Sequence, residues 1–178
     1  AQGILPISVP SLSLQPGDKL DFLVHANGST NSDSFRWALR LREVSPQKSG
    51  PTRFAARARN DFNYVRDILA GTNGPGSWTY WMANLEIPET GGATLANLAP
   101  IRQLDEESLK LTPLRQFPVP NRDLGYLSLY PTGGHPGQDS KVVIRRWRAN
   151  ATGKYRVSGE VFRPSQKGDG IRAMILKN

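Results

Sequence analysis

The clearest pattern in this chain is the alternation of apolar and polar residues. Over residues 35–42 the apolar side chains stand at every second position, and arginines stand at 36, 40 and 42. A period of two is typical of a β-strand that buries one face. Residues 19–24 and 154–161 repeat the pattern, and 142–147 and 171–176 are further apolar runs. The side chains expected to face inward are Leu20, Phe22, Val24, Phe35, Trp37, Leu39, Leu41, Tyr155, Val157 and Val161.

Glycine and proline separate these runs. They cluster at 15–18 (QPGD), 132–137 (TGGHPG) and 167–170 (KGDG), compositions that favour turns. Many short strands with turns between them predict an all-β fold, a β-sandwich of jelly-roll type. A length of 178 residues suits one domain, 1–178, with an ample core.

One segment has a different period. From 52 to 70 the apolar residues Phe54, Ala58, Phe62, Val65 and Leu69 recur at steps of three and four, which predicts one amphipathic helix. Residues 45–76 are therefore interpreted as a connector that carries this helix. A helix packed on the edge of the sandwich is favoured over a helix that binds a partner, because amphipathic helices usually pack on their own domain. Residues 105–109 predict a short acidic helical turn.

The net charge is +8, and one end of the chain carries all of it. Residues 141–178 hold ten lysines and arginines against two acidic residues, while the other 140 residues hold thirteen of each sign. Such an imbalance attracts anions such as acidic polysaccharide, acidic lipid or nucleic acid. A solvated strand face explains the same charges, and the sequence leaves the two readings open.

Several kinds of chemistry are excluded by composition. The chain has no cysteine, so it has no thiol nucleophile, cysteine-based zinc site, iron–sulfur cluster or covalently attached haem. Its histidines, His25 and His135, are far apart in sequence. No spacing pairs two carboxylates for glycoside hydrolysis, and no phosphate-binding glycine loop is present. No apolar run has the length of a membrane span. We expect a non-catalytic protein without a cofactor.

Aromatic residues beside arginines are the candidates for ligand binding, because rings stack on sugars and guanidinium groups bind acidic or sulfated ones. Trp147 follows Arg145 and Arg146 directly. Trp78 and Tyr80 follow a glycine-rich stretch and are expected to be exposed, on opposite faces of their strand. Trp37 shares its parity with the apolar positions of its strand and is assigned to the core.

Polar candidates lie in the turns. His135 lies between glycine and proline and is interpreted either as a ligand contact or as a turn residue that bonds to the backbone. Asp21, Asp33 and Asp169 are weak candidates for a structural calcium site, since calcium needs six to eight oxygen ligands and no local loop concentrates carboxylates.

An ordered string of motifs resembles a known family. It runs through GYL (125–127), TGGHPG (132–137), IRRW (144–147), GKYRVSG (153–159) and GDGIR (168–172). The string is similar to the β-sandwich domain that recurs in large cytochrome-c-linked secreted proteins of planctomycete bacteria. The family's closing motif resembles PGDKLDF (16–22) and NSDSFRW (31–37), which stand first in this chain.

The resemblance therefore implies a circularly permuted domain. Residues 1–44 would supply the closing strands, 45–76 the connector, and 77–178 the opening and central strands. A natural permutant, an engineered one and an assembly that exchanges residues 1–44 between chains are all compatible with this order.

The resemblance also implies an extracytoplasmic setting, periplasmic or secreted. Together with the charge, it leads to a predicted lectin-like module for acidic or sulfated polysaccharide. The alternative is an assembly module of a larger extracytoplasmic protein, with another protein chain as partner. Nucleic acid ranks below both, because no aromatic pattern of an RNA-binding sheet is present.

Overall fold

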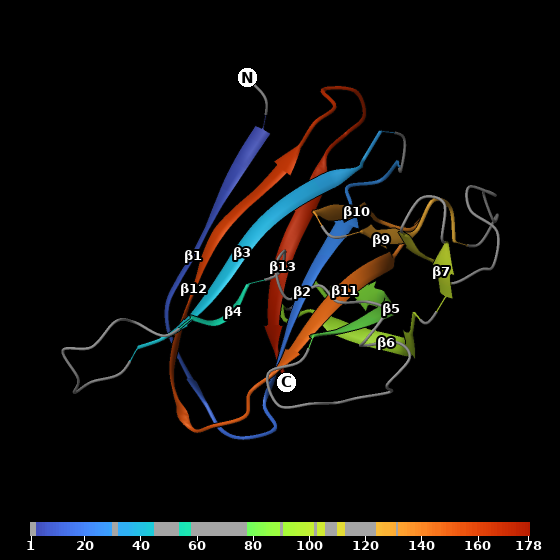
Figure 1. Ribbon diagram of the computed structural model, residues 1–178. Coiled ribbons are helices and arrows are strands. Elements are labelled where there is room, and N and C mark those ends of the chain that lie inside the picture. Colours follow the sequence, from blue (N-terminus) through green and yellow to red (C-terminus); the bar gives the residue numbers. More distant parts are fainter. Residues whose placement is uncertain are drawn as a thin grey trace.

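The computed structural model describes residues 3–29, 32–44, 54–57, 78–89, 91–101, 103–105, 110–112, 124–130 and 132–178. All regular secondary structure in these ranges is β-strand, arranged in two antiparallel sheets (Figure 1). The all-β, sandwich-like prediction is confirmed. The finer jelly-roll assignment stays a prediction.

Sheet A has eight strands and sheet B has five. In spatial order sheet A contains β1 (Gly3–Leu14), β12 (Gly153–Arg163), β3 (Phe35–Glu43), β10 (Gly133–His135), β9 (Ser128–Tyr130), β8 (Lys110–Thr112) and β7 (Gln103–Asp105), and β4 (Phe54–Arg57) also pairs with β3. Sheet B contains β13 (Ile171–Lys177), β2 (Lys19–Ala26), β11 (Lys141–Arg148), β5 (Trp78–Glu86) and β6 (Thr94–Pro100).

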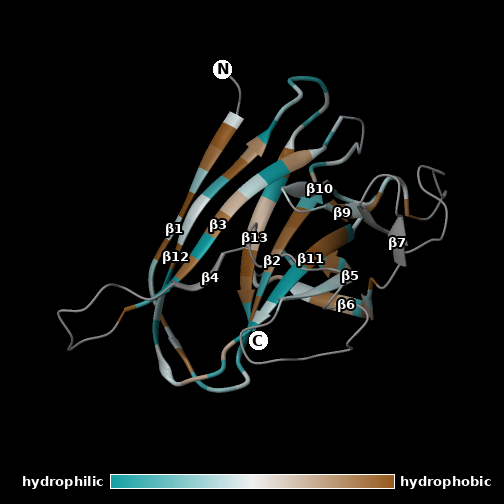
Figure 2. Ribbon diagram, in the orientation of Figure 1, coloured by the Kyte–Doolittle hydropathy of each residue, from teal (hydrophilic) through white to brown (hydrophobic). Residues whose placement is uncertain are grey.

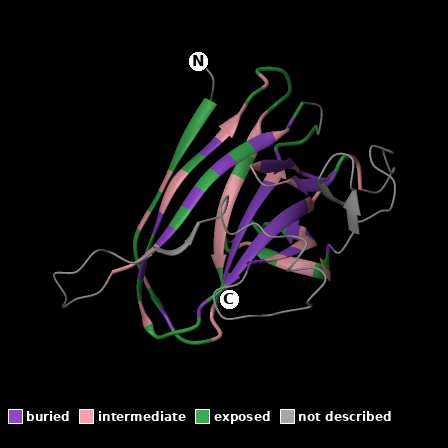
Figure 3. Cartoon of the chain, in the orientation of Figure 1, coloured by how far each residue is buried: buried purple, intermediate pink, exposed green. Residues whose placement is uncertain are grey.

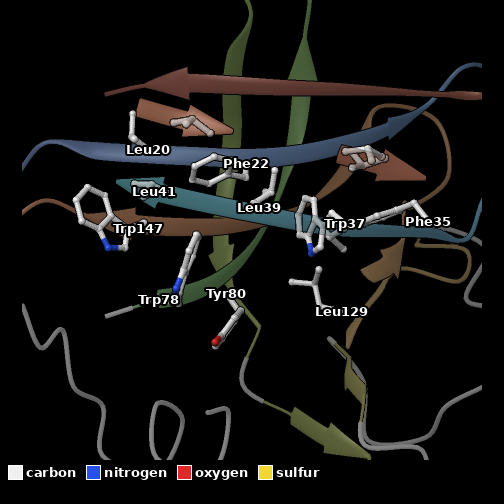
Figure 4. Close-up of a cluster of buried hydrophobic side chains, with 14 of the residues drawn as sticks. Leu20, Phe22, Phe35, Trp37, Leu39, Leu41, Trp78, Tyr80, Leu129 and Trp147 are labelled. Carbon is white, nitrogen blue, oxygen red and sulfur yellow. The ribbon is translucent and has the colours of Figure 1, made fainter. Parts of the chain in front are cut away.

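The main core lies between the two sheets and follows the predicted alternation. Phe35, Trp37, Leu39 and Leu41 of β3 are buried, and so are the predicted inward residues of β2 and β12 (Figure 4). The residues between them on β3 are polar or small, and Figure 2 shows the two kinds alternating along the strand. Each fully buried large apolar side chain contributes about 1.5–3 kcal/mol. Burial of one face therefore fixes the register of β3 and β12.

Sheet B also buries part of its outer face. Leu23, Ala83, Leu85, Val142 and Ile144 form a second apolar cluster there. Strand β11 is consequently buried on both faces over most of its length (Figure 3). This explains why Val142, Val143 and Ile144 are three consecutive apolar residues, a pattern typical of strands that are covered on both sides.

The prediction of a helix over 52–70 is wrong for 54–57, the part of this segment that the structure describes. Phe54–Arg57 form β4, which pairs with residues 40–42 of β3. Residues 35 and 36 of β3 pair with β10, so β4 takes the part of the same edge that β10 leaves open. Ladder hydrogen bonds outweigh a local helical period in such a place. The rest of the proposed helix lies outside the described residues. In the predicted acidic turn, Asp105 ends β7, and 106–109 also lie outside them.

The two chain ends lie at opposite ends of the sandwich (Figure 1). Gly3 pairs with Arg163 at one end of β1, whereas the Lys177 ammonium group donates to the carbonyl oxygen of Ser13 at the other. At about 3.3 Å per strand residue, these two points of β1 are roughly 33 Å apart. The close termini that a simple permutant calls for are not found, so the permuted order stays a prediction.

Gly133 marks the closest approach of two strands. A Cβ atom at this position would lie 1.8 Å from the carbonyl oxygen of Phe35 on β3. Only glycine therefore allows β10 to pair here at its present distance. By contrast, a Cβ atom at Gly3 would meet nothing within 4 Å.

We expect Gly133→Ala to lower the free energy of unfolding by about 3 kcal/mol, because the added methyl group must displace backbone. Gly3→Ala, the matched control, should change it by less than about 0.5 kcal/mol. Urea unfolding followed by tryptophan fluorescence measures both. Equal stabilities of the two variants would contradict the close approach.

Candidate functional site

Three of the predicted ligand residues belong to the core instead. Trp78, Tyr80 and Trp147 are 1%, 4% and 1% exposed (Figure 4). The ring of Trp78 packs against Phe22 at 5.6 Å between centroids, and that of Trp147 against Tyr155 at 5.4 Å. The expectation of exposed rings on opposite faces was wrong, because residues two apart on a strand share a face. For Trp78 and Tyr80 that face is the inner face of β5.

Arg145 is also buried in the core. Its guanidinium group donates to the carbonyl oxygens of Tyr130 and Gly133, the latter at 3.4 Å, and lies over the ring of Trp37 at 4.7 Å. Burial lowers the pKa of Arg145 to about 9, so it stays charged at neutral pH. Arg145 therefore connects β11 of sheet B to the β9–β10 hairpin of sheet A, and it is not available to a ligand at the surface.

Arg146 points to the other face of sheet B and is paired there. Its Nε and Nη2 donate to the two carboxylate oxygens of Asp21 at 2.6 and 2.7 Å, and its guanidinium group lies over Trp81 at 5.2 Å. The Asn178 amide donates to Asp21 as well, at 2.7 Å. Both Asp21 oxygens are thus occupied by donors, which removes the first calcium candidate.

The other two calcium candidates do come together, at the end of the sandwich near Arg163. Asp33 is buried, and its Oδ1 lies 3.5 Å from Nη1 of Arg163. Asp169 accepts the Ser29 backbone N–H at 2.8 Å. Burial and the nearby charge of Asp169 raise the pKa of Asp33 to about 6. Among the described residues no three metal-ligating side chains gather, and Arg163 contacts Asp33. A calcium site here stays a weak candidate.

His135 makes the backbone hydrogen bond expected of a turn residue, and its role as a ligand contact stays a prediction. A hydrogen bond of 2.7 Å joins its Nδ1 to the carbonyl oxygen of Pro136. Its ring meets that of Tyr126 edge-on, with 5.6 Å between centroids. Tyr126 is 42% exposed. The pair places one accessible aromatic ring beside the end of β10.

Basic residues instead gather on the outer face of sheet A. Because their strand neighbours are buried, Arg36, Arg40 and Arg42 of β3 and Lys154 and Arg156 of β12 point away from the core. All five are exposed except Arg42, which is half-buried. The exposed and buried residues of β3 alternate along the strand, as Figure 3 shows. We call these five residues the basic face.

The basic face places like charges side by side. Arg156 and Arg42 are direct register partners on neighbouring strands, an arrangement that normally costs stability. Arg156 donates through Nε to the carbonyl oxygen of Pro10 on β1, at 3.4 Å, which draws it away from β3. In the part of the chain that the structure describes, no ion pair with a carboxylate involves Arg36, Arg40 or Arg156.

Two aromatic residues lie at one end of this face. Phe162 and Arg36 are register partners, and Arg36, Gly133 and Tyr130 follow each other across β3, β10 and β9. The Tyr130 hydroxyl donates to carbonyl oxygens of Phe35 and Gly134, each at 3.3 Å, so its ring crosses the glycines of β10. Both rings are half-buried. The face thus combines cations with partly accessible rings.

The charge count along the sequence located this face only in part. Of the ten basic residues in 141–178, Arg145 is in the core, and Arg146, Arg163 and Lys177 form ion pairs. Lys154 and Arg156 join three arginines from the part of the chain whose charges cancel. Two sequence patterns together could have predicted the face. One is the alternation of arginines with apolar residues in 36–42, and the other is the alternation of Lys154 and Arg156 with the apolar positions 155 and 157.

Comparison with known proteins adds no relative: no family model, no curated protein and no solved structure matches this chain. Within the described residues, no helix is long and apolar enough to cross a membrane.

The buried Asp33 predicts a pH dependence of stability. Its pKa is raised from 3.8 to about 6 in the fold, so it stabilises the fold fully below about pH 4, and this contribution is lost as the pH rises through 6. Asp33→Asn removes the ionisation and should raise the free energy of unfolding at pH 7 by about 1–3 kcal/mol, with little effect at pH 4.

Urea unfolding of both proteins at pH 4, 5, 6 and 7 measures this difference. Asp18→Asn is a suitable control, because the half-buried Asp18 has its pKa lowered by the Gln15 backbone N–H. That substitution should cost stability at pH 7. If Asp33→Asn destabilises the protein equally at every pH, the raised pKa is contradicted.

Proposed function

We propose that this protein is a non-catalytic binding module for acidic polysaccharide and that the basic face is its binding surface. The observation that carries the proposal is the exposure of Arg36, Arg40 and Arg156 on one sheet face, without an ion-pairing carboxylate among the described residues. A fold normally balances such charges or disperses them, because adjacent cations repel. An anionic partner offsets the repulsion.

The geometry of the sheet suits a polymer with repeated charges. Neighbouring strands lie about 4.8 Å apart, and outward residues of one strand repeat at about 6.6 Å. The face therefore presents several cations within one or two sugar lengths. Guanidinium groups bind carboxylates and sulfates through two parallel hydrogen bonds. Several weak contacts to one polymer then add up through effective concentration.

The two rings at the end of the face supply the contact with the sugar itself. Tyr130 and Phe162 flank the row that contains Arg36. Partly accessible rings pack on the apolar faces of sugars, while neighbouring polar groups bind the hydroxyls. This arrangement takes the role that Trp78, Tyr80 and Trp147 were expected to have.

The proposed function is binding without catalysis. Glycoside hydrolysis usually needs two opposed carboxylates, and Glu160 is the carboxylate that β12 contributes to this face. The resemblance to the planctomycete domain, with its permuted jelly-roll order and extracytoplasmic setting, stays a prediction. It supports a polysaccharide as partner, because such polymers are met outside the cell.

Dextran sulfate tests the proposal directly. The double variant Arg40→Glu/Arg156→Glu should bind it at least about tenfold more weakly than the wild type, because two cations of the basic face become anions that repel the polymer. Lys167→Glu/Arg148→Glu carries the same charge change on exposed residues off the basic face and should lose much less. Affinity of the wild type should fall steeply between 50 and roughly 300 mM salt.

Fluorescence anisotropy with labelled dextran sulfate measures these affinities, and neutral dextran is the blank. An equal loss in both double variants would mean that net charge, and not the basic face, governs binding. A wild type that binds no acidic polysaccharide at low salt would overturn the proposed function.

A further inference from the structure

A second surface feature is the free edge of β13. In sheet B this strand pairs with β2 alone. Asn178 and Lys19 exchange both backbone hydrogen bonds, at 2.8 and 3.0 Å, and the Asn27 N–H donates to Gly170 at 3.1 Å. In this antiparallel register, even-numbered residues of β13 bond to β2, and odd-numbered residues turn their backbone groups outward. The outward residues are Ile171, Ala173, Ile175 and Lys177.

These outward groups form an open hydrogen-bonding edge. Within the described residues, the N–H and C=O groups of Ile171, Ala173 and Ile175 have no ladder partner on that side. The strand has the sequence IRAMILK, with neither proline nor glycine. Nothing in it interrupts pairing with another strand.

Two other edges of the sandwich are protected, which makes β13 distinctive. β1 carries Pro6 and Pro10, which have no N–H to donate, and its pairing with β12 is interrupted by a bulge after Val9. β6 ends at Pro100, has an irregular register with β5, and contains Asn97 with a φ of 52°. Prolines, bulges and irregular backbone are the devices by which natural edges avoid strand addition.

The side chains of β13 are incompletely covered. Ile171, Ala173 and Ile175 pack on the main core, and Met174 and Leu176 pack on the outer cluster, yet all five are only half-buried. A further strand on the free side would cover both rows. Backbone bonds and alternating apolar contacts are the two elements of peptide binding by strand addition.

The charge of β13 indicates which kind of strand would pair with its free edge. Arg172 is exposed, and no ion pair within the described part of the chain holds it. Because Arg172 bonds to β2, it occupies a non-hydrogen-bonded position on the free side, where opposite side chains approach most closely. β13 contains two cations and no acid, and the whole chain carries +8, so a second copy offers no complementary charge.

We propose that the free edge of β13 accepts an extended acidic segment of another protein as an additional antiparallel strand of sheet B. The segment has apolar side chains at alternate positions, facing the core row, and a carboxylate opposite Arg172. This site is separate from the basic face and does not depend on the proposed polysaccharide function.

A designed peptide tests the site. It is nine residues long with valine at alternate positions and a glutamate placed opposite Arg172, and its binding is followed by fluorescence anisotropy. The key variant is Ala173→Pro, which removes an outward N–H and no bond to β2. We expect it to weaken peptide binding at least about tenfold, while Ala173→Val, which keeps the N–H, binds as the wild type does.

Charge exchange completes the experiment. Arg172→Glu should weaken binding of the glutamate peptide and restore binding of a peptide that has lysine in its place. Thermal unfolding of Ala173→Pro close to that of the wild type shows that the variant is folded; if it is unfolded, the Arg172→Glu exchange decides alone. The Arg40→Glu/Arg156→Glu variant should bind the peptide normally, which separates this site from the basic face.

Three results would overturn the proposal. One is a wild type that does not bind the peptide. Another is equal binding by Ala173→Pro and Ala173→Val. The third is a wild type that self-associates in sedimentation while Ala173→Pro does not, since a second copy would then occupy the edge.

Discussion

The structure depends on the burial of β11 on both of its faces. This strand lies at the centre of sheet B, between β2 and β5, and it contributes apolar side chains to the main core and to the outer cluster. Two consecutive arginines, Arg145 and Arg146, are therefore forced away from water in opposite directions. Burying a charge is costly unless it is paired or hydrogen-bonded, and each arginine meets this demand differently. Arg145 uses carbonyl oxygens and the Trp37 ring, and Arg146 uses the Asp21 carboxylate.

The hydrogen bonds of these two arginines also connect separate parts of the chain. Arg145 ties the centre of sheet B to the β9–β10 hairpin, where Gly133 lets the hairpin approach β3. Arg146 and Asp21 join β11 to β2, and Asn178 closes the same group from the end of β13. Charges that serve structure in this way are unavailable for binding. On the outer face of sheet A, by contrast, Arg36, Arg40 and Arg156 form no ion pair with a carboxylate of the described residues.

Sequence reasoning succeeded where one physical rule dominated. Along β3 and β12 only one face is buried, so alternation identified both the strands and their inward residues. It failed for Trp78, Tyr80 and Trp147, because aromatic residues beside glycines or arginines look alike whether a second sheet covers them or not. It failed at Phe54–Arg57 because a free stretch of the β3 edge outweighed a local helical period. The basic face was only half visible, since its five residues come from two strands whose pairing, Arg42 with Arg156, is set by the fold.

The placement of the chain ends has a mechanical consequence. Gly3 lies at one end of the sandwich, and Asn178 lies at the other, beside Lys19. Tension applied between these points runs along β1, parallel to the strand and perpendicular to its hydrogen bonds with β12. Such a load shears the whole ladder at once, whereas a load on adjacent ends would unzip it one bond at a time. The sandwich is thus built to resist stretching along its long axis, with β1 and β13, the strands next to the two chain ends, bearing the force.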